Sequence, residues 1–189
     1  MTSQPPRVSF KKMSDGTPED FRIVAANDRQ TDETLYLRVL EHLRMQAEDD
    51  GAYWVDRLEH VLQTATRAER DGASDDWIVG SLLHDIGDVL APHTHGEVAS
   101  EIIRPFVEPV VTWVVRHHGV FQRFYNSSLT AEQRRAREQY SDHPHYQAAV
   151  NFCEKWDQLS FDPDYDSFGL EHFEDVVQRV FARKPFWFD

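Results

Sequence analysis

The chain has 189 residues, enough to bury one sizeable core, and we expect a single domain over residues 1–189. It carries 20 Lys and Arg against 33 Asp and Glu, a net charge of −13. Nucleic acids and anionic membrane surfaces attract basic faces, so this charge disfavours both as partners. We therefore expect the partner to be a small molecule.

The apolar segments are short. The longest, residues 107–115, is interrupted by Glu108, Pro109 and Thr112 and cannot span a bilayer. The first ten residues lack the apolar run of a signal peptide, and the one cysteine, Cys153, cannot form an internal disulfide. We expect no membrane segment and a reducing, cytoplasmic setting.

Apolar residues recur at helical spacing along the chain, and no segment has a competing strand pattern, so we predict an all-α fold. Residues 1–16 lack periodicity and are expected to form a loose arm. A helix then begins at Pro18 with Thr17 as its N-cap. The next two helices are predicted over about 31–47, ended by Asp49-Asp50-Gly51, and over about 53–71, ended by Gly72. A short helix capped by Asp75 or Asp76 then runs through Leu83, and another runs from His95 to before Pro105. The remaining helices are predicted through 110–115, from Thr130 to about Tyr140, from Tyr146 towards Asp157 and from Leu170 to Val180.

Two of these helices begin with the pattern of a capping box, in which the N-cap side chain and the third helical residue bond each other's backbone. The patterns are Thr94-His95-Gly96-Glu97 and Thr130-Ala131-Glu132-Gln133. They predict that His95 lies in the first turn of its helix. We expect a helical bundle with peripheral N- and C-terminal helices.

His84 and Asp85 are the strongest local signal, because two adjacent residues offer metal ligands from one piece of backbone. Asp85 follows Leu82 by three residues and Ile78 by seven, so it extends an apolar stripe. A buried aspartate requires a cation or hydrogen-bond partners. The alternative is an aspartate that caps the turn at Gly87.

A second carboxylate also continues an apolar stripe. Asp157 follows Ala149, Val150 and Cys153 at helical spacing, which predicts that it lies on the buried face of a helix. Two carboxylates in such positions favour a cation site over coincidence.

Further histidines are candidates with alternatives. His60 lies beside the apolar arc of its helix, which by itself is typical of a solvated residue, and His95 is equally typical of an exposed first-turn residue. His118 continues the stripe of Val114 and Val115, but His117 continues one as well, so spacing leaves both open. We assign surface or packing roles to His42, His93, His143, His145 and His172.

The candidate residues occur in three ordered segments: Leu58-Glu59-His60-Val61-Leu62-Gln63-Thr64-Ala65, then Leu82-Leu83-His84-Asp85-Ile86-Gly87, then a late Asp157. This order resembles the HD superfamily of metal-dependent phosphohydrolases. Three more segments are similar to its oxygenase branch, which includes myo-inositol oxygenase and the bacterial phosphonate-cleaving diiron oxygenases: His95-Gly96-Glu97, Arg116-His117-His118-Gly119-Val120-Phe121 and Trp156-Asp157. The Arg-x-His-x-x-Phe pattern selects His118 over His117, and the resemblance places the metal-binding core at about 53–161.

The resemblance implies a dinuclear metal site. One metal would be bound by His60, His84, Asp85 and Asp157, and the second by His95, His118 and a bridging Asp85. Four imidazoles and two carboxylates can hold two metals about 3.5–4 Å apart. These ligand types do not distinguish iron from zinc, manganese or nickel, so a mixed-valent Fe(II)/Fe(III) pair is implied by the resemblance alone.

The resemblance further implies a diiron oxygenase that uses O₂ to cleave a C–C or C–P bond of a small hydroxylated substrate. The alternative enzyme is a metal-dependent HD phosphohydrolase, which would use the same ligands with other divalent metals to hydrolyse a phosphate ester or nucleotide. A metal-dependent sensor is a third class, which turnover of any metabolite would exclude. No residue beyond the metal ligands is assigned a catalytic role.

Three positions depart from the pattern of these relatives. Asp88 and Phe161 occupy positions where myo-inositol oxygenase has lysines, and Gln122 occupies one where phosphonate oxygenases have a lysine. We expect Asp88 and Gln122 to contribute to substrate binding and to favour a neutral or cationic substrate that carries a hydroxyl. Arg116 and Arg123 are the remaining candidates for an anion contact. Alternatively, Asp88 hydrogen-bonds a ligand histidine or caps a turn.

Overall fold

The computed structural model describes residues 6–48 and 52–185, and within these ranges it contains α-helices and short 3-10 helices but no β-strand. The predicted all-α fold is confirmed. Its α-helices are α1 (Pro18–Glu33), α2 (Leu35–Met45), α3 (Arg57–Arg70), α4 (Asp75–Leu83), α5 (His95–Ile103), α6 (Pro109–Gln122), α7 (Ala131–Arg134), α8 (Tyr146–Lys155) and α9 (Leu170–Phe181). The predicted stop signal Asp49-Asp50-Gly51 lies outside the described residues.

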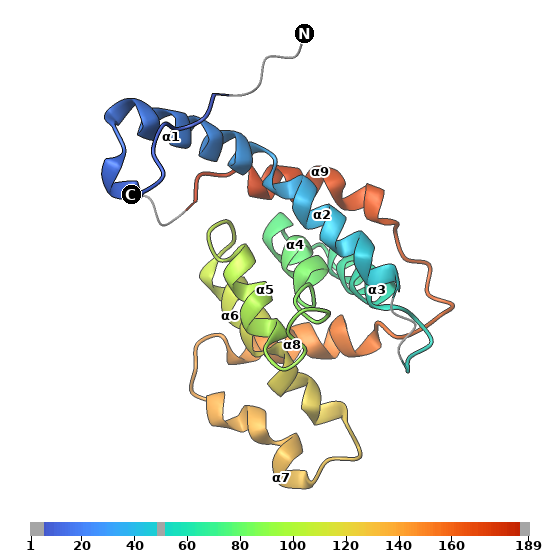
Figure 1. Cartoon of the computed structure of the whole chain (residues 1–189). Helices are drawn as coiled ribbons and strands as arrows, with labels where there is room; N and C mark the ends of the chain where they lie inside the picture. The colour runs from blue at the N-terminus through green and yellow to red at the C-terminus, as the bar shows by residue number, and fades with distance from the viewer. Residues whose placement is uncertain (1–5, 49–51, 186–189) are drawn as a thin grey trace.

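Helix α4 is central to the bundle, since it packs against α3, α6 and α9. Helix α9 also lies beside α2, and α6 packs on α5 and α8 (Figure 1). Helix α1 extends away from this bundle at one end, and the short α7 lies at the other (Figure 1). Within the part of the chain that the structure describes, no helix combines the length and apolar character needed to cross a bilayer.

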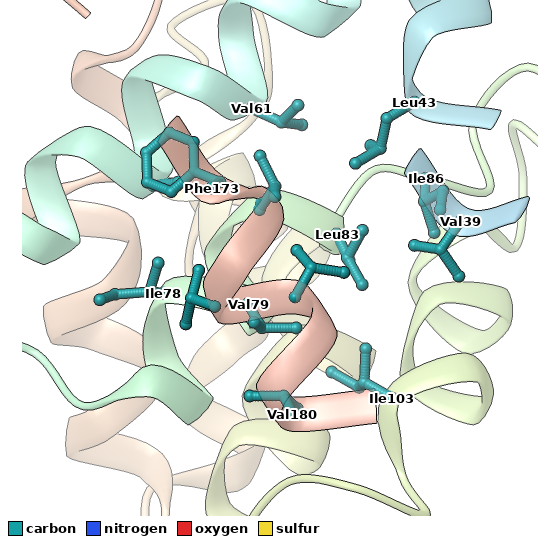
Figure 2. Packing of buried hydrophobic residues seen from close by; sticks show 14 of the residues in the cluster. Val39, Leu43, Val61, Ile78, Val79, Leu83, Ile86, Ile103, Phe173 and Val180 are labelled. Carbon is teal, nitrogen blue, oxygen red and sulfur yellow. The ribbon is translucent and has the colours of Figure 1, made fainter. Parts of the chain in front are cut away.

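The main hydrophobic core contains residues of six helices, α2 to α6 and α9. Leu43 of α2, Val61 of α3, Leu83 of α4 and Phe173 of α9 are completely or almost completely buried in one cluster (Figure 2). Burying a side chain of this kind contributes about 1.5–3 kcal/mol relative to leaving it in water. Because Leu83 is the last residue of α4, this core holds the chain in place immediately before His84.

A second, smaller core joins α6 to α8. It consists of Val114, Phe121, Ala149, Phe152 and Cys153, all buried. The two helices that carry it run towards the same region as the end of α4. The second core therefore sets the positions of the residues on α6 and of the chain that follows α8.

Thr17, Thr94 and Thr130 are all N-caps, as predicted, and His95 lies in the first turn of its helix, but the capping box predicted at Thr94 does not form. The hydroxyls of Thr17 and Thr130 accept hydrogen bonds from the backbone N–H of Asp20 and Gln133, and both capping boxes are complete. Thr94 is the N-cap of α5, as predicted, but its side chain forms no capping hydrogen bond. The chain enters α5 with a φ of −139° and a ψ of 25° at Thr94, which differs from the extended conformation of the two complete caps.

The cap predicted for α4 is also wrong. Ser74 holds the N-cap position, so Asp75 and Asp76 lie in the first turn of the helix. Asp76 instead accepts a hydrogen bond from the backbone N–H of Glu108 at 2.7 Å and pairs with Arg183 at 2.5 Å. It thereby ties α4 to the start of α6 and to the chain that follows α9.

Several helix boundaries differ from the prediction. Helix α1 continues to Glu33 and α2 begins at Leu35, past the predicted start at about residue 31. Helix α3 begins only at Arg57, because Asp56 accepts a hydrogen bond from the third helical N–H and caps it. The helix predicted from residue 130 to 140 breaks into α7 and the 3-10 helix Ala136–Tyr140. These segments are largely exposed, so apolar spacing carries little information about their ends.

The predicted loose arm is partly attached to the bundle. Residues 6–16 contain only a short 3-10 helix, Met13–Asp15. The backbone N–H of Ser9 donates to the Asp20 carboxylate at 2.6 Å, so this segment is fixed to the first turn of α1.

The backbones of α5 and α6 approach each other closely at Gly96. A methyl group at this position would lie 2.9 Å from the carbonyl oxygen of Arg116 and 3.1 Å from that of Val115. Backbone atoms cannot rotate away as a side chain does, so only glycine allows this approach. The approach matters because it brings the N-terminus of α5 next to the last turns of α6.

We expect Gly96→Ala to lower the free energy of unfolding by about 1–3 kcal/mol, because the two helices must separate. The measurement is denaturant unfolding of the metal-free protein. Gly119→Ala on α6 is the matched control: its methyl group would meet its nearest neighbour, His95 Nε2, at 3.9 Å, and alanine has the higher helix propensity. Equal stability of the two variants would contradict the close-packing argument.

Candidate metal centre

The six side chains predicted as metal ligands converge from five separate segments of the chain. His84, His118 and Asp157 are almost fully buried and His60 nearly so, whereas the side chains of Asp85 and His95 retain 18% and 25% of their exposure. The segments are α3 with His60, the turn after α4 with His84 and Asp85, the start of α5 with His95, α6 with His118, and the 3-10 helix Asp157–Leu159.

Each of the four histidines has its Nδ1 atom against a backbone carbonyl oxygen. The distances are 2.8 Å from His60 to Ser160, 2.7 Å from His84 to Ser81, 3.0 Å from His95 to Pro92 and 2.6 Å from His118 to Val115. A carbonyl oxygen only accepts hydrogen bonds, so each Nδ1 carries the hydrogen. In the neutral ring the Nε2 atom then carries a lone pair, which is the arrangement of histidines that bind metals.

The Nε2 atoms face one another in two pairs. His60 Nε2 lies 3.2 Å from His84 Nε2, and His95 Nε2 lies 3.2 Å from His118 Nε2. Two lone pairs at this distance repel each other unless a proton or a metal ion lies between them. Two nitrogen ligands held at about 2.1 Å from one ion, at right angles, are about 3 Å apart. The donor atoms therefore suit metal ions.

Asp85 lies between the two histidine pairs and offers one oxygen to each. Its Oδ2 lies 3.5 Å from His60 Nε2 and 3.4 Å from His84 Nε2. Its Oδ1 lies 3.4 Å from His95 Nε2 and 3.1 Å from His118 Nε2. This is the geometry of a carboxylate that bridges two ions.

Asp157 approaches only the first histidine pair. Its Oδ1 lies 3.4 Å from His60 Nε2 and 3.8 Å from His84 Nε2, and the same oxygen accepts a hydrogen bond from Gln122 Nε2 at 2.8 Å. The thiol of Cys153 donates to its Oδ2 at 3.7 Å. These two donors hold the carboxylate in one orientation.

Two groups of donor atoms are compact enough, within 4.8 Å, to share one ion in the described part of the chain. One contains His60, His84 and Asp157, and the other contains His84, Asp85 and His118. His95 belongs to neither group, although its Nε2 approaches Asp85 and His118. It is also the most exposed of the four histidines, so it is the donor with the most freedom to adjust.

Burial and charge shift the pKa values of the site in opposite directions. Burial lowers the pKa of His84 to about 4. Burial also lowers the pKa of His118, but the hydrogen bond and the charge of Asp85 outweigh it and raise this pKa to about 9. Burial raises the pKa of Asp85, yet His84 and His118 hold it well below the usual range. Protons on histidines thus balance buried carboxylates, and a cation can replace them.

A cavity of about 190 Å³ opens beside the histidines. It is lined by Ala52, Tyr53, Val55, Asp56, Arg57, His60, Asp85, Asp88, His95, Gln122 and Phe161. Asp88 and Gln122 thus lie where the sequence analysis expects substrate contacts. The cavity reaches residues of both histidine pairs, so a small molecule inside it lies next to the whole donor set.

The positions of Arg116 and Arg123 do not support the predicted role in substrate binding. Neither is among the described residues that line the cavity. Arg116 forms an ion pair with Glu101 on α5, and Arg123 lines a different hollow beside α7. Arg116 and Arg123 lie on either side of His118 in the sequence, but Arg116 is held by Glu101 and the side chain of Arg123 is exposed.

Arg57, a cationic residue in the cavity lining, is not among the site residues predicted from the sequence. Its guanidinium forms an ion pair with Asp88, whose Oδ1 also lies 3.6 Å from His95 Nδ1. The negative charge of Asp88 is therefore opposed by Arg57, which occupies none of the positions where relatives carry lysine. The available signal was spacing, since Arg57 precedes His60 by three residues and shares its helix face.

His60 was also misjudged by its pattern, which alone predicts a solvated residue. The residue is only 5% exposed because the chain after Asp157 folds over α3 and stacks Phe161 on the imidazole, with ring centroids 4.4 Å apart. The ring of Tyr53 also packs on Phe161, with ring centroids 4.7 Å apart. The burial of this side of α3 comes from a segment about 100 residues later.

The other histidines occupy the surface and packing positions expected for them. His117 stacks on Trp113 with ring centroids 4.3 Å apart, and His143 stacks on the same indole at 4.1 Å. His42 contacts the carbonyl oxygen of Ile86 at 3.0 Å. The tertiary structure thus separates His118, which is buried in the site, from its neighbour His117.

Comparison with known proteins identifies the class. The HD-domain family model matches residues 36–143, more than half of the chain, and the chain belongs to this family. It is also 37% identical over 81 residues to (1-hydroxy-2-(trimethylamino)ethyl)phosphonate dioxygenase (glycine-betaine-forming) of Leisingera caerulea. That match covers 37% of this chain and 41% of the relative, so it spans about two fifths of the relative's length. The resemblance to the oxygenase branch is confirmed.

We expect wild-type protein to bind two metal ions per chain and Asp85→Ala to lose both, because the two oxygens of Asp85 face different histidine pairs. His118→Ala should weaken mainly one ion, by about tenfold or more. Elemental analysis after loading with Fe(II) under argon and desalting measures both. His117→Ala is the control and should retain both ions. Loss of a single ion in the Asp85 and His118 variants alike would contradict the bridging role.

Metal affinity should rise with pH between about 7 and 9. The pKa of His118 is about 9 in the metal-free protein, above its ordinary value of 6.5, so a proton must leave this ring before it binds a metal. For the same reason the metal-free protein should lose stability as the pH rises from 6.5 through 9. Calorimetric metal titration in two buffers of different ionisation enthalpy counts the released protons. An affinity independent of pH above 7 would refute the assignment.

Proposed function

We propose that this protein is an HD-domain oxygenase that holds two iron ions and uses O₂ to cleave a C–P or C–C bond of a small hydroxylated substrate. The observation that carries the proposal is Asp85, whose two oxygens face two separate histidine pairs. A site for a single ion would have no use for the second pair, His95 and His118. Similarity to a phosphonate dioxygenase supports oxygen chemistry over hydrolysis.

The proposed ligands follow the two sides of Asp85. They are His60, His84, Asp157 and Asp85 for the first iron, and His95, His118 and Asp85 for the second. When bound, the iron pair supplies the redox chemistry for O₂ activation and a Lewis acid for a substrate hydroxyl. A mixed-valent Fe(II)/Fe(III) state is part of the proposal, because the oxygenase branch that the sequence resembles uses it.

The protein's own residues would orient ligands and substrate. The four Nδ1–carbonyl hydrogen bonds prevent the imidazoles from rotating, and Gln122 keeps Asp157 directed at His60. Tyr53 and Phe161 pack on each other in the cavity lining, and Phe161 also stacks on His60.

The substrate class we propose is a 1-hydroxyphosphonate. It replaces the neutral or cationic substrate expected from Asp88, Gln122 and Phe161, because Arg57 in the cavity lining opposes the charge of Asp88. The relative's name describes a carbon that carries both a hydroxyl and a phosphonate, and this chain shares the HD ligand pattern. The balanced reaction is R–CH(OH)–PO₃H⁻ + O₂ → R–COO⁻ + H₂PO₄⁻ + H⁺. The C–P and C–H bonds break, the carbon is oxidised to a carboxylate, O₂ is reduced, and one oxygen atom is added to each product.

We expect Fe(II)-loaded protein to consume O₂ in a one-to-one ratio with phosphate released from 1-hydroxyphosphonates. An oxygen electrode and a phosphate assay measure this, with 1-hydroxyphosphonates bearing and lacking a trimethylamino group, polyols and amino alcohols as the panel. Electron paramagnetic resonance after partial oxidation should detect the coupled iron pair. Asp85→Ala is the inactive control.

The rival enzyme, a metal-dependent phosphohydrolase, requires no O₂. Hydrolysis of nucleotides or other phosphate esters under argon, without oxygen uptake on any member of the panel, would therefore overturn the oxygenase proposal.

A further inference from the structure

The cavity beside the histidines contains an arginine whose role the metal site does not explain. Arg57 is the described lining residue with a permanent positive charge, because guanidinium does not lose its proton in proteins. The three carboxylates of the lining have different tasks. Asp85 faces the four histidines, Asp56 accepts a hydrogen bond from the N–H of Glu59 at 2.7 Å as the cap of α3, and Asp88 pairs with Arg57.

The Arg57–Asp88 pair lines the cavity and is partly exposed. The Arg57 side chain keeps 36% of its exposure and that of Asp88 keeps 15%. An ion pair of this exposure is weak, because water screens it. An anion that enters the cavity can therefore compete with Asp88 for the guanidinium, which matches phosphonates and carboxylates with two parallel hydrogen bonds.

Other candidates for an anion contact are engaged elsewhere or apolar. Gln122 donates to Asp157, Phe161 stacks on His60, and Arg116 pairs with Glu101 outside the cavity. A chain with a net charge of −13 repels anions unless a local cation compensates. In the described lining of this cavity, that cation is Arg57.

We propose that Arg57 is the specificity residue that binds the anionic group of the substrate, and that Asp88 is the internal counter-ion competing with that group. Arg57 and His60 share one face of α3, so an anion on the guanidinium lies on the His60 side of the metal centre. This inference deepens the proposed function, on which it relies for the reaction that follows binding. Binding itself can be measured without turnover.

The test is calorimetric titration of the iron-loaded protein under argon with methylphosphonate, which lacks the hydroxyl that the proposed reaction requires. Arg57→Met should weaken binding by about tenfold or more, and Arg57→Lys by less, since lysine keeps the charge but not the paired donors. Asp88→Asn should strengthen binding several-fold, because the competing carboxylate is removed. Arg116→Met, a matched arginine outside the cavity, should bind as the wild type does.

The double variant separates competition from general repulsion. In the Arg57→Met background, Asp88→Asn should leave the affinity almost unchanged, because there is no guanidinium left to release. Equal strengthening in both backgrounds, or wild-type affinity in Arg57→Met, would overturn the proposal. Circular dichroism and metal content establish that each variant folds; if Arg57→Met does not, Arg57→Lys and Asp88→Asn decide the question.

The binding test does not depend on whether the protein catalyses the proposed oxidation. If methylphosphonate binding depends on Arg57 while no hydroxyphosphonate is oxidised, the oxygenase proposal fails and the anion site stands. If hydroxyphosphonates are oxidised while the affinity for methylphosphonate and the KM are the same in the wild type and in Arg57→Met, the anion site fails and the oxygenase proposal stands.

Discussion

Four imidazole Nε2 atoms gathered around two carboxylates are the feature on which the rest of this structure depends. The backbone carbonyls fix the histidine tautomers, and the burial of His84, His118 and Asp157 removes the water that would otherwise solvate them. Buried polar atoms of one kind facing one another raise the free energy of the folded chain unless a cation or protons intervene. The metal-free site therefore lowers the stability of the fold, and a bound metal ion restores that stability.

The packing of the helical bundle holds these donor side chains in place. The main core includes Leu83 and Ile86, which flank the His84-Asp85 pair in the sequence, and the second core holds α6 against α8 through residues that flank His118 and precede Asp157. Gly96 permits α5 to lie directly on the backbone of α6. Rigid packing on each side of the site limits how far the donors can move when an ion binds.

The charged and polar residues around the ligand set distinguish this chain from the relatives that it resembles. Positions where relatives carry lysine hold Asp88, Gln122 and Phe161, and the structure assigns these side chains to an ion pair, a hydrogen bond to a carboxylate and a stacked ring. A cation is nevertheless present in the cavity, supplied by Arg57 from the start of α3. The anionic Asp88 therefore has a cationic partner in the cavity lining that occupies none of these three positions.

The sequence by itself determined the all-α class, the family and the ligand residue types, because helical periodicity, capping residues and the His-Asp order are local properties. Helical spacing alone left His117 and His118 undecided and placed His60 in solvent, so both of these ligand predictions rested on the family resemblance, and Arg57 was overlooked. Those three depend on which segments cover which helix faces, and such contacts join residues as far apart as His60 and Ser160. Only the tertiary structure brings them together, since packing between distant segments has no local pattern in the chain.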